Sequence, residues 1–410
     1  MITVRLHEYQ AKRILSRSGV PVPRGRVAAS VDEVRRIADW LGKRVVLKAQ
    51  VLTGGRGRAG GIRLANDAGE AERLAGQMFG MDIHGYVASK VLVDEAIDVE
   101  QEIYLGITVD RMGYTHRGAA QAVIVASATG GLEISEVAHD TPERVYRIPI
   151  DPLLGLRVYQ IRELAYEIGL GREQTHKFVP VAMGLWRAFR DCDATLVEAN
   201  PLVVRPDGNL VSLNAKMVID DNALFRHRDL SDMRDESQET EAERLARRHG
   251  IHYVRLGGRV GCLSNGAGLA MATMDLLRLH GVRAANFVDI GVGAQVAADG
   301  LHPKVILGLR LALTNSIRAV LVSIFGGVTR CDEVARGILA AHDEMAFDVP
   351  LVVRLEGTNK QAGRALLAEA ASTRGRARVY LAESLADAVE QVVALVRDDR
   401  QVNKSNEHPG

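Results

Sequence analysis

The stretch Leu196–Arg226, LVEANPLVVRPDGNLVSLNAKMVIDDNALFR, decides how the first half of the chain is interpreted. Two β-prone runs, Leu196–Arg205 and Leu210–Val218, flank the tetrapeptide Pro206-Asp207-Gly208-Asn209. Proline and glycine between hydrophobic segments favour a tight turn. We therefore predict a β-hairpin.

A symmetric hairpin centred on Asp207 would place Asn200 opposite Asn214 and Glu198 opposite Lys216. Facing Cβ atoms in such pairs lie about 4.5–5.5 Å apart. Because strand side chains alternate between faces, Glu198 and Asn200 would project together. Carboxylate and amide oxygens, completed by water and phosphate, suit Mg²⁺. The hairpin alone is equally consistent with an ordinary polar outward face.

A glycine-rich segment earlier in the chain favours a phosphate site. The predicted strand Val45–Val51 leads into the segment KAQVLTGGRGRAGG (48–61). The glycines of this segment stand at 54, 55, 57, 60 and 61, around Arg56 and Arg58. Exposed backbone N–H groups and arginines together form an anion cradle. The segment lacks the GK[ST] ending of a P-loop, and a solvated hairpin is the alternative. Lys48, just before the loop, favours phosphate binding.

Bulk properties exclude several classes of partner. The 410 residues suggest two or three domains, and a formal net charge of +1 gives no reason to expect nucleic-acid binding. No run of about 18 apolar residues occurs, so no membrane association is expected. Three cysteines without a CxxC pair indicate a reducing compartment. We expect a cytoplasmic protein.

The second half alternates predicted strands and helices after a charged segment, 229–249. This order is typical of a parallel, doubly wound sheet, in which ligands bind beyond the carboxyl ends of the strands. Three glycine-rich turns would meet at that edge: Asn265–Gly268, Gly291–Gly293 and Gly326–Gly327. Each could be only a tight turn, but together they indicate an anion-binding edge. The polar tail 398–410 is expected to be disordered.

Several motifs in a fixed order carry a family resemblance over residues 1–396. They are LHEYQAK (6–12), KAQVLTGGRGRAGG (48–61), EANPLVV (198–204), DDNALFR (220–226), NGAGLAMATMD (265–275) and IFGG followed by RCD (324–332). The chain resembles the β-subunit of succinyl-CoA synthetase, and β-subunits of malate–CoA ligase share these motifs.

The resemblance implies an α/β protein with an ATP-grasp domain over 1–240 and a flavodoxin-like CoA-ligase domain over 241–397. It implies an ADP-forming acid–CoA ligase that uses Mg²⁺, in which ATP phosphorylates a histidine on a separate α-subunit. The phosphoryl group then passes to the acid, and coenzyme A displaces phosphate. Succinate is the default acid, and a malate–CoA ligase is the alternative. A non-catalytic nucleotide-binding homologue is the alternative from another class.

The same resemblance implies roles for individual residues. The expected ATP-phosphate ligands are Lys48, Gly55, Arg56 and Gly57, and the expected nucleotide contacts are Asp94 and Glu102. The expected metal ligands are Asn200 and Asn214, and Glu198 would steady the phosphohistidine. The expected acid and phosphate contacts are Asn265, Gly327, Val328 and Thr329. None of the twelve histidines stands in a Gly-His-Ala-Gly loop, so the α-subunit, which also carries most of the CoA site, is required.

The chain departs from the family pattern at three places. Asn214 stands where the family usually has aspartate, which removes a formal charge from the expected metal site. Asp94 replaces a usual glutamate. The family's Asp-x-Gly-Gly-Gly loop becomes DIGVG at 289–293, and the segment that follows is longer than usual.

Overall fold

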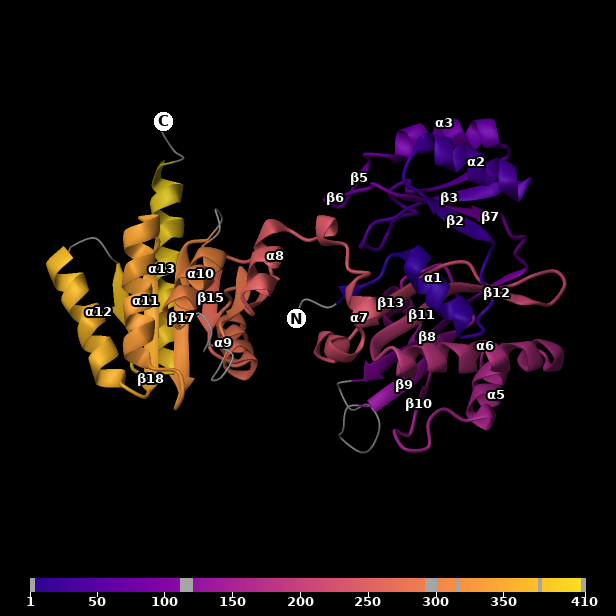
Figure 1. The fold of residues 1–410 in the computed structure, drawn as a ribbon. Helices are drawn as coiled ribbons and strands as arrows, with labels where there is room; N and C mark the ends of the chain where they lie inside the picture. Colours follow the sequence, from indigo (N-terminus) through magenta and orange to yellow (C-terminus); the bar gives the residue numbers. More distant parts are fainter. Residues whose placement is uncertain (1–3, 111–120, 292–300, 314–316, 375–377, 407–410) are drawn as a thin grey trace. The chain divides into compact units, whose positions relative to one another are not determined.

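The computed structural model describes residues 4–110, 121–291, 301–313, 317–374 and 378–406. The chain divides into two compact units between Gln238 and Glu239 (Figure 1). The boundary expected from the sequence, 240/241, lies beside this division.

The first unit contains a large antiparallel sheet in the order β1-β13-β11-β8-β9-β10, with β12 paired to β11. Its strands are β1 (Val4–Arg5), β8 (Gln101–Asp110), β9 (Gln121–Ser127), β10 (Tyr146–Pro149), β11 (Ala194–Val204), β12 (Leu210–Ser212) and β13 (Ala215–Ile219). Strands β8 and β9 are neighbours in this sheet and pair antiparallel from Tyr104–Ser127 to Asp110–Gln121.

The predicted hairpin is confirmed together with its register. Glu198 pairs with Lys216, and the Asn200 N–H donates to the Asn214 carbonyl at 3.2 Å. Gly208 has a φ of +70° at the turn, a conformation that glycine adopts without steric cost. The returning strand is interrupted between β12 and β13, so Asn214 lies at a break in the ladder beside the cavity described below.

Helices α1 (Glu8–Arg17), α5 (Val158–Glu167) and α6 (Arg172–Asp191) supply the core beside this sheet. Alternating strand residues Ile103, Leu105 and Ile107 are fully buried, as period-two patterning requires. Helix α1 packs Leu15 into this core while placing two charged side chains, Glu8 and Lys12, in buried positions. Burial of charge on an otherwise amphipathic helix requires partners from elsewhere.

A second antiparallel sheet of the first unit has the order β2-β7-β3-β4 and is packed by α2 and α3 (Figure 1). Ser30 caps α2, and its side chain accepts the Glu33 N–H. The glycine-rich segment forms the connection between β3 and β4. The elements are β2 (Gly25–Ala28), α2 (Val31–Leu41), β3 (Val45–Ala49), β4 (Ile62–Ala65), α3 (Ala68–Met78) and β7 (Val91–Glu95).

Short elements complete the first unit. They are β5 (Asp82–Ile83), β6 (Tyr86–Val87), α4 (Ile134–Asp140), α7 (Arg228–Ser231) and the 3₁₀ turns η1 (Pro142–Arg144), η2 (Asp221–Arg226) and η3 (Glu236–Gln238).

The second unit is a doubly wound sheet in the order β14-β16-β15-β17-β18-β19. Strands β15 to β19 are parallel, and numbered from β15 they follow the flavodoxin-like order 2-1-3-4-5. The first strand, β14, instead pairs antiparallel with β16. The expectation of a wholly parallel sheet is therefore wrong at this edge, where hydrophobic pattern alone carries no strand direction.

Helices cover both faces of this sheet. On β17, Val320, Val322 and Ile324 pack toward α10 and α11, whereas Ala319 and Leu321 pack toward α9 and α13. The elements are α8 (Glu241–Arg248), β14 (His252–Arg255), β15 (Val260–Ser264), α9 (Ala267–Leu279), β16 (Asn286–Asp289), α10 (Leu301–Ala312), β17 (Ala319–Gly326), α11 (Cys331–Met345), β18 (Leu351–Gly357), α12 (Lys360–Arg374), β19 (Val379–Leu381) and α13 (Leu385–Asn406).

The expected disordered tail is partly wrong, because α13 continues to Asn406. Extending an existing helix needs no new nucleation, so a polar segment can add turns to an apolar, anchored one. Residues 407–410 lie outside the described residues, as do Val292 and Gly293 of the second predicted glycine turn. Among the helices that are described, none is both long and apolar enough to cross a membrane.

Candidate functional site

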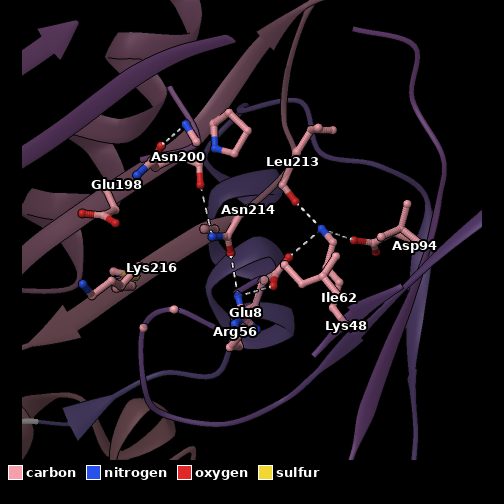
Figure 2. Close-up of a pocket in the computed structure, with 18 of the residues that line it drawn as sticks. Glu8, Lys48, Arg56, Ile62, Asp94, Glu198, Asn200, Leu213, Asn214 and Lys216 are labelled. Atoms are coloured by element: carbon pink, nitrogen blue, oxygen red, sulfur yellow. Dashed lines mark hydrogen bonds and ion pairs between the residues drawn. The ribbon is translucent and has the colours of Figure 1, made fainter. Parts of the chain in front are cut away.

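A cavity of ≈ 1210 Å³ in the first unit gathers most of the residues predicted to bind nucleotide and metal (Figure 2). It is lined by residues of both sheets and by the glycine-rich loop. The predicted residues among its lining are Lys48, Gly55, Arg56, Gly57, Asp94, Glu198, Asn200 and Asn214. The structure thus brings together segments that lie up to 166 positions apart, from 48 to 214, around one hollow.

One carboxylate, that of Glu8, organises the cations at this cavity. Its Oε1 lies 2.8 Å from Lys12 Nζ and 2.9 Å from Lys48 Nζ, and its Oε2 lies 2.7 Å from the Arg56 guanidinium. The Glu8 side chain is only 1% exposed. Three cations therefore share one carboxylate that is shielded from water.

Asp94 is the second carboxylate of this cluster. Its Oδ2 lies 2.5 Å from Lys12 Nζ and 3.0 Å from Lys48 Nζ. Lys48 Nζ also donates to the Leu213 carbonyl, which ties β3 to the hairpin (Figure 2). Asp94 is 2% exposed, so in this structure it is first a counter-ion of two lysines.

The charges in this cluster shift one another's titration. Burial alone would raise the pKa of Glu8, but Lys12, Lys48 and Arg56 outweigh it and hold that pKa well below its usual range. Burial opposes ionisation of Lys48, yet Glu8 and Asp94 raise its pKa above the usual value. For Lys12, burial lowers the pKa, and the same two carboxylates counter that effect. Lys48 therefore remains a cation at neutral pH.

Asn200 and Asn214 join the hairpin to two loops at the cavity. Asn200 bonds to the loop at 131–132, and Asn214 bonds to Arg56 of the glycine-rich loop. The Asn200 Oδ1 accepts the Gly131 N–H at 2.8 Å, and its Nδ2 donates to the Leu132 carbonyl at 2.8 Å. The Asn214 Nδ2 donates to the Asn200 carbonyl at 3.1 Å, and its Oδ1 accepts from Arg56 at 3.0 Å. Both side-chain oxygens predicted to bind metal thus already accept one hydrogen bond.

These two amides fit a metal ion only as secondary ligands. An amide oxygen has two lone pairs, so each keeps one for a cation. Within the described residues, no group of three or more His, Cys, Asp or Glu side chains could hold a metal ion. Mg²⁺ is often bound by few protein oxygens together with substrate phosphates and water. The donor set suits a Mg²⁺ ion that is held mainly by phosphate.

Glu198 lies beside this network on β11, facing Lys216 of β13. Burial raises the pKa of its carboxyl, Lys216 opposes that shift, and the nearby Glu133 adds to it. The Tyr104 hydroxyl donates to its Oε2 at 3.4 Å. A carboxylate with a raised pKa at the wall of a cavity is a common feature of functional sites.

Glu102 is the one predicted residue of the first unit that is not among the cavity-lining residues. It pairs with Val203 in the large sheet, and its carbonyl accepts the Gly130 N–H. Conversely, no role was predicted from the sequence for Glu8 and Lys12, although both lie in the motif LHEYQAK (6–12). Their spacing of four residues on an amphipathic helix was the available signal, because an acid and a base so placed form one ion pair.

The remaining predicted residues meet in the second unit, at the switch point of the doubly wound sheet. Asn265 follows β15 and Thr329 follows β17, and the Asn265 Nδ2 donates to the Thr329 hydroxyl at 3.0 Å and to the Phe325 carbonyl at 2.9 Å. The Asn265 Oδ1 accepts the Phe325 N–H at 2.9 Å. Gly327 and Val328 lie in the same turn, with Val328 72% exposed. Two of the predicted glycine turns are thus joined by one buried amide.

Asp289 fixes the turn after β15 from the neighbouring strand. It accepts from the Gly266 N–H at 2.6 Å and the Gly291 N–H at 2.9 Å, and Gly266 has a φ of +108° that favours glycine. Burial would raise the pKa of Asp289, but His252 and these two backbone donors hold it below the usual range.

Comparison with known proteins identifies the family. An ATP-grasp domain matches residues 5–204, and a CoA-ligase region matches residues 263–393. The chain is 50% identical over 393 residues to the succinate–CoA ligase [ADP-forming] subunit beta of Roseiflexus sp., covering 95% of this chain and 98% of that protein. It is 48% identical to the protein of that name from Chloroflexus aurantiacus, covering 97% of this chain and 100% of the other.

More distant proteins are similar to this chain in sequence or in fold. A subunit beta 2 of the same name from Archaeoglobus fulgidus is 44% identical over 96% of this chain and 100% of its own length. The fold is similar to ATP citrate lyase from Methanothrix soehngenii, at a TM-score of 0.67 and 18% identity, covering 96% of this chain and 100% of that one. The chain belongs to the family of ADP-forming succinate–CoA ligase β-subunits.

Proposed function

We propose that the chain is the β-subunit of an ADP-forming acid–CoA ligase, with succinate as the acid and ATP as the phosphoryl donor. The observation that carries this proposal is the cluster in which Lys48 and Arg56 border the cavity beside the glycine-rich loop. The names of relatives at 44–50% identity support the same activity. A cytoplasmic location suits a reaction that needs a free thiol.

The cavity is suited to the phosphates of ATP. Lys48 Nζ and the Arg56 guanidinium would neutralise phosphate oxygens, and the N–H groups of Gly55 and Gly57 would cradle them. Phosphoryl transfer requires positioning and charge neutralisation more than covalent chemistry from the protein. Asn200 and Asn214 would hold Mg²⁺ together with the phosphates, and the ion would supply charge that two neutral amides do not.

The phosphoryl acceptor would come from a separate α-subunit. Its histidine nitrogen would attack the γ-phosphorus, so that an N–P bond forms while the bond to the ADP oxygen breaks. The Glu198 carboxylate would accept the N–H of that imidazole and orient it for attack. For this role Glu198 must be ionised, and its raised pKa makes the requirement pH-sensitive.

The acid and phosphate would bind at the turns of the second unit. The Asn265 amide and the Thr329 hydroxyl hold the ends of β15 and β17 together, at the edge where doubly wound sheets bind ligands. Gly327 and Val328 would contribute backbone N–H groups to the same site. The α-subunit would carry most of the CoA site.

A thiol-consumption assay on the complex with the cognate α-subunit tests this function. Loss of the CoA thiol should require both ATP and succinate. Activity with malate in place of succinate would assign the chain to malate–CoA ligases. A complex that binds Mg-ATP yet consumes no thiol with either acid would contradict the ligase function.

A further inference from the structure

Lys12 contacts two residues that line the cavity, Glu8 and Asp94, and has no role in the function proposed above. Its side chain is 6% exposed, and its Nζ contacts Glu8 Oε1 at 2.8 Å and Asp94 Oδ2 at 2.5 Å. Glu8, Lys48, Arg56 and Asp94 all line the cavity, whereas Lys12 is not among the described residues that do. A ligand in the cavity would therefore meet the other four side chains and not Lys12.

The charge balance of the cluster depends on Lys12. Three cations and two carboxylates leave one positive charge in excess. Without Lys12, Glu8 and Asp94 would be balanced by Lys48 and Arg56 alone, and this cluster would have no excess positive charge to offer an anion. Two carboxylates within 2.8 Å of the Lys12 nitrogen favour its charged form.

The contacts also decide where Lys48 and Arg56 point. Lys48 shares both carboxylates with Lys12, and Arg56 shares Glu8 with it. Removing Lys12 would leave both carboxylates to draw these two cations inward. Ion pairs that are shielded from water are strong enough to fix side chains in this way.

We propose that Lys12 is a positioning residue of the nucleotide site. From outside the cavity lining it neutralises the carboxylates of Glu8 and Asp94, so that Lys48 and Arg56 remain available to phosphate. This inference rests on the proposed function, because it takes the cavity to be the ATP site. It assigns Lys12 an electrostatic task at a place where it touches no ligand.

Binding of a charged and an uncharged ligand to the full-length chain separates this task from a merely structural one. Calorimetry would compare Mg-ATP with adenosine for the wild type and Lys12→Met. The affinity for Mg-ATP should fall at least about tenfold, because a unit charge within about 12 Å of a phosphate contributes at least about 1.4 kcal/mol at an effective dielectric constant of about 20. The affinity for adenosine should change less than about twofold. Lys177→Met is the matched control, because Lys177 lies on α6 and pairs with Glu173 instead.

A second variant keeps the test valid if Lys12→Met does not fold. Lys12→Gln is also uncharged but can still donate hydrogen bonds to both carboxylates, and it should show the same selective loss. Equal loss of Mg-ATP and adenosine, or no loss of either, in a folded variant would overturn the inference. A wild-type chain that binds no Mg-ATP would instead overturn the proposed function, and the inference with it.

Discussion

Replacing Glu8 with glutamine removes the carboxylate that three cations share. Lys12, Lys48 and Arg56 lie 2.8, 2.9 and 2.7 Å from it, and its side chain is 1% exposed, so water cannot take its place. Breaking a buried ion pair by removing one partner costs about 3–5 kcal/mol, because the other charge stays buried. Glutamine keeps the shape and one acceptor oxygen, so we expect the free energy of unfolding to fall by about 3 kcal/mol.

Tryptophan fluorescence measures this loss in the correct part of the chain. The only two tryptophans in the sequence, Trp40 and Trp186, belong to the first unit. Urea unfolding followed by their emission therefore reports that unit. With a slope of about 2–3 kcal/mol per molar urea, Glu8→Gln should lower the midpoint by about 1–1.5 M.

Glu72→Gln is the matched control for burial. Glu72 pairs with Arg35 at 2.7 Å, the same distance as Glu8 to Arg56, but the two side chains are 34% and 57% exposed. Exposed pairs contribute under about 1 kcal/mol. If Glu72→Gln lowers the midpoint as much as Glu8→Gln, burial does not set the strength of the Glu8 cluster.

The same experiment has a defined pH dependence. The folded-state pKa of Glu8 is held below its ordinary value of 4.5, so its stabilising contribution is fully present above that pH. It is lost as the pH falls through the lower, folded-state pKa. The difference between wild type and Glu8→Gln should stay constant near neutral pH and shrink only on acidification below 4.5.

Three further predictions concern the proposed site. Asn214→Asp restores a carboxylate beside Arg56 and should lower severalfold the Mg²⁺ concentration for half-maximal activity of the complex; an unchanged Mg²⁺ requirement would show that this position is not a ligand. Because burial raises the pKa of Glu198, wild-type kcat should fall on acidification at a higher pH than an ordinary glutamate would give, and Glu198→Gln should be slower and lack this fall. An acid limb that persists in Glu198→Gln belongs to another group. Asn265→Ala removes three hydrogen bonds, of about 1 kcal/mol each, and should speed amide hydrogen exchange around Phe325 and Thr329; unaltered exchange there would contradict its role as the tie between the two turns.

Much of the first unit's site could be predicted from local pattern. The turn at 206–209 sets the hairpin register, so Glu198 opposite Lys216 and Asn200 beside Asn214 followed from counting. Lys48 and the glycine-rich loop are adjacent in sequence, so their shared location needed only one strand and its turn.

The buried charge cluster could not be predicted in the same way. Its members come from α1, β3, the loop after it and β7, and no local periodicity relates those segments. The family resemblance implied a nucleotide contact for Asp94, and the structure places Asp94 in the lining of the cavity. Its pairing with Lys12 and Lys48 was not predicted. The direction of β14 was missed for a related reason, since its partner β16 lies beyond α9 in the chain.

If this chain places ATP for transfer of its γ-phosphoryl group to a histidine of another subunit, labelled phosphate should reach that subunit. The direct measurement is incubation of the complex with γ-³²P-labelled ATP and Mg²⁺, followed by separation of the two subunits. We expect label on the α-subunit that survives alkali and is lost in acid, as is typical of phosphohistidine, and little label with the Glu198→Gln variant. Label on this chain itself, or none on either subunit of a complex that binds Mg-ATP, would contradict it.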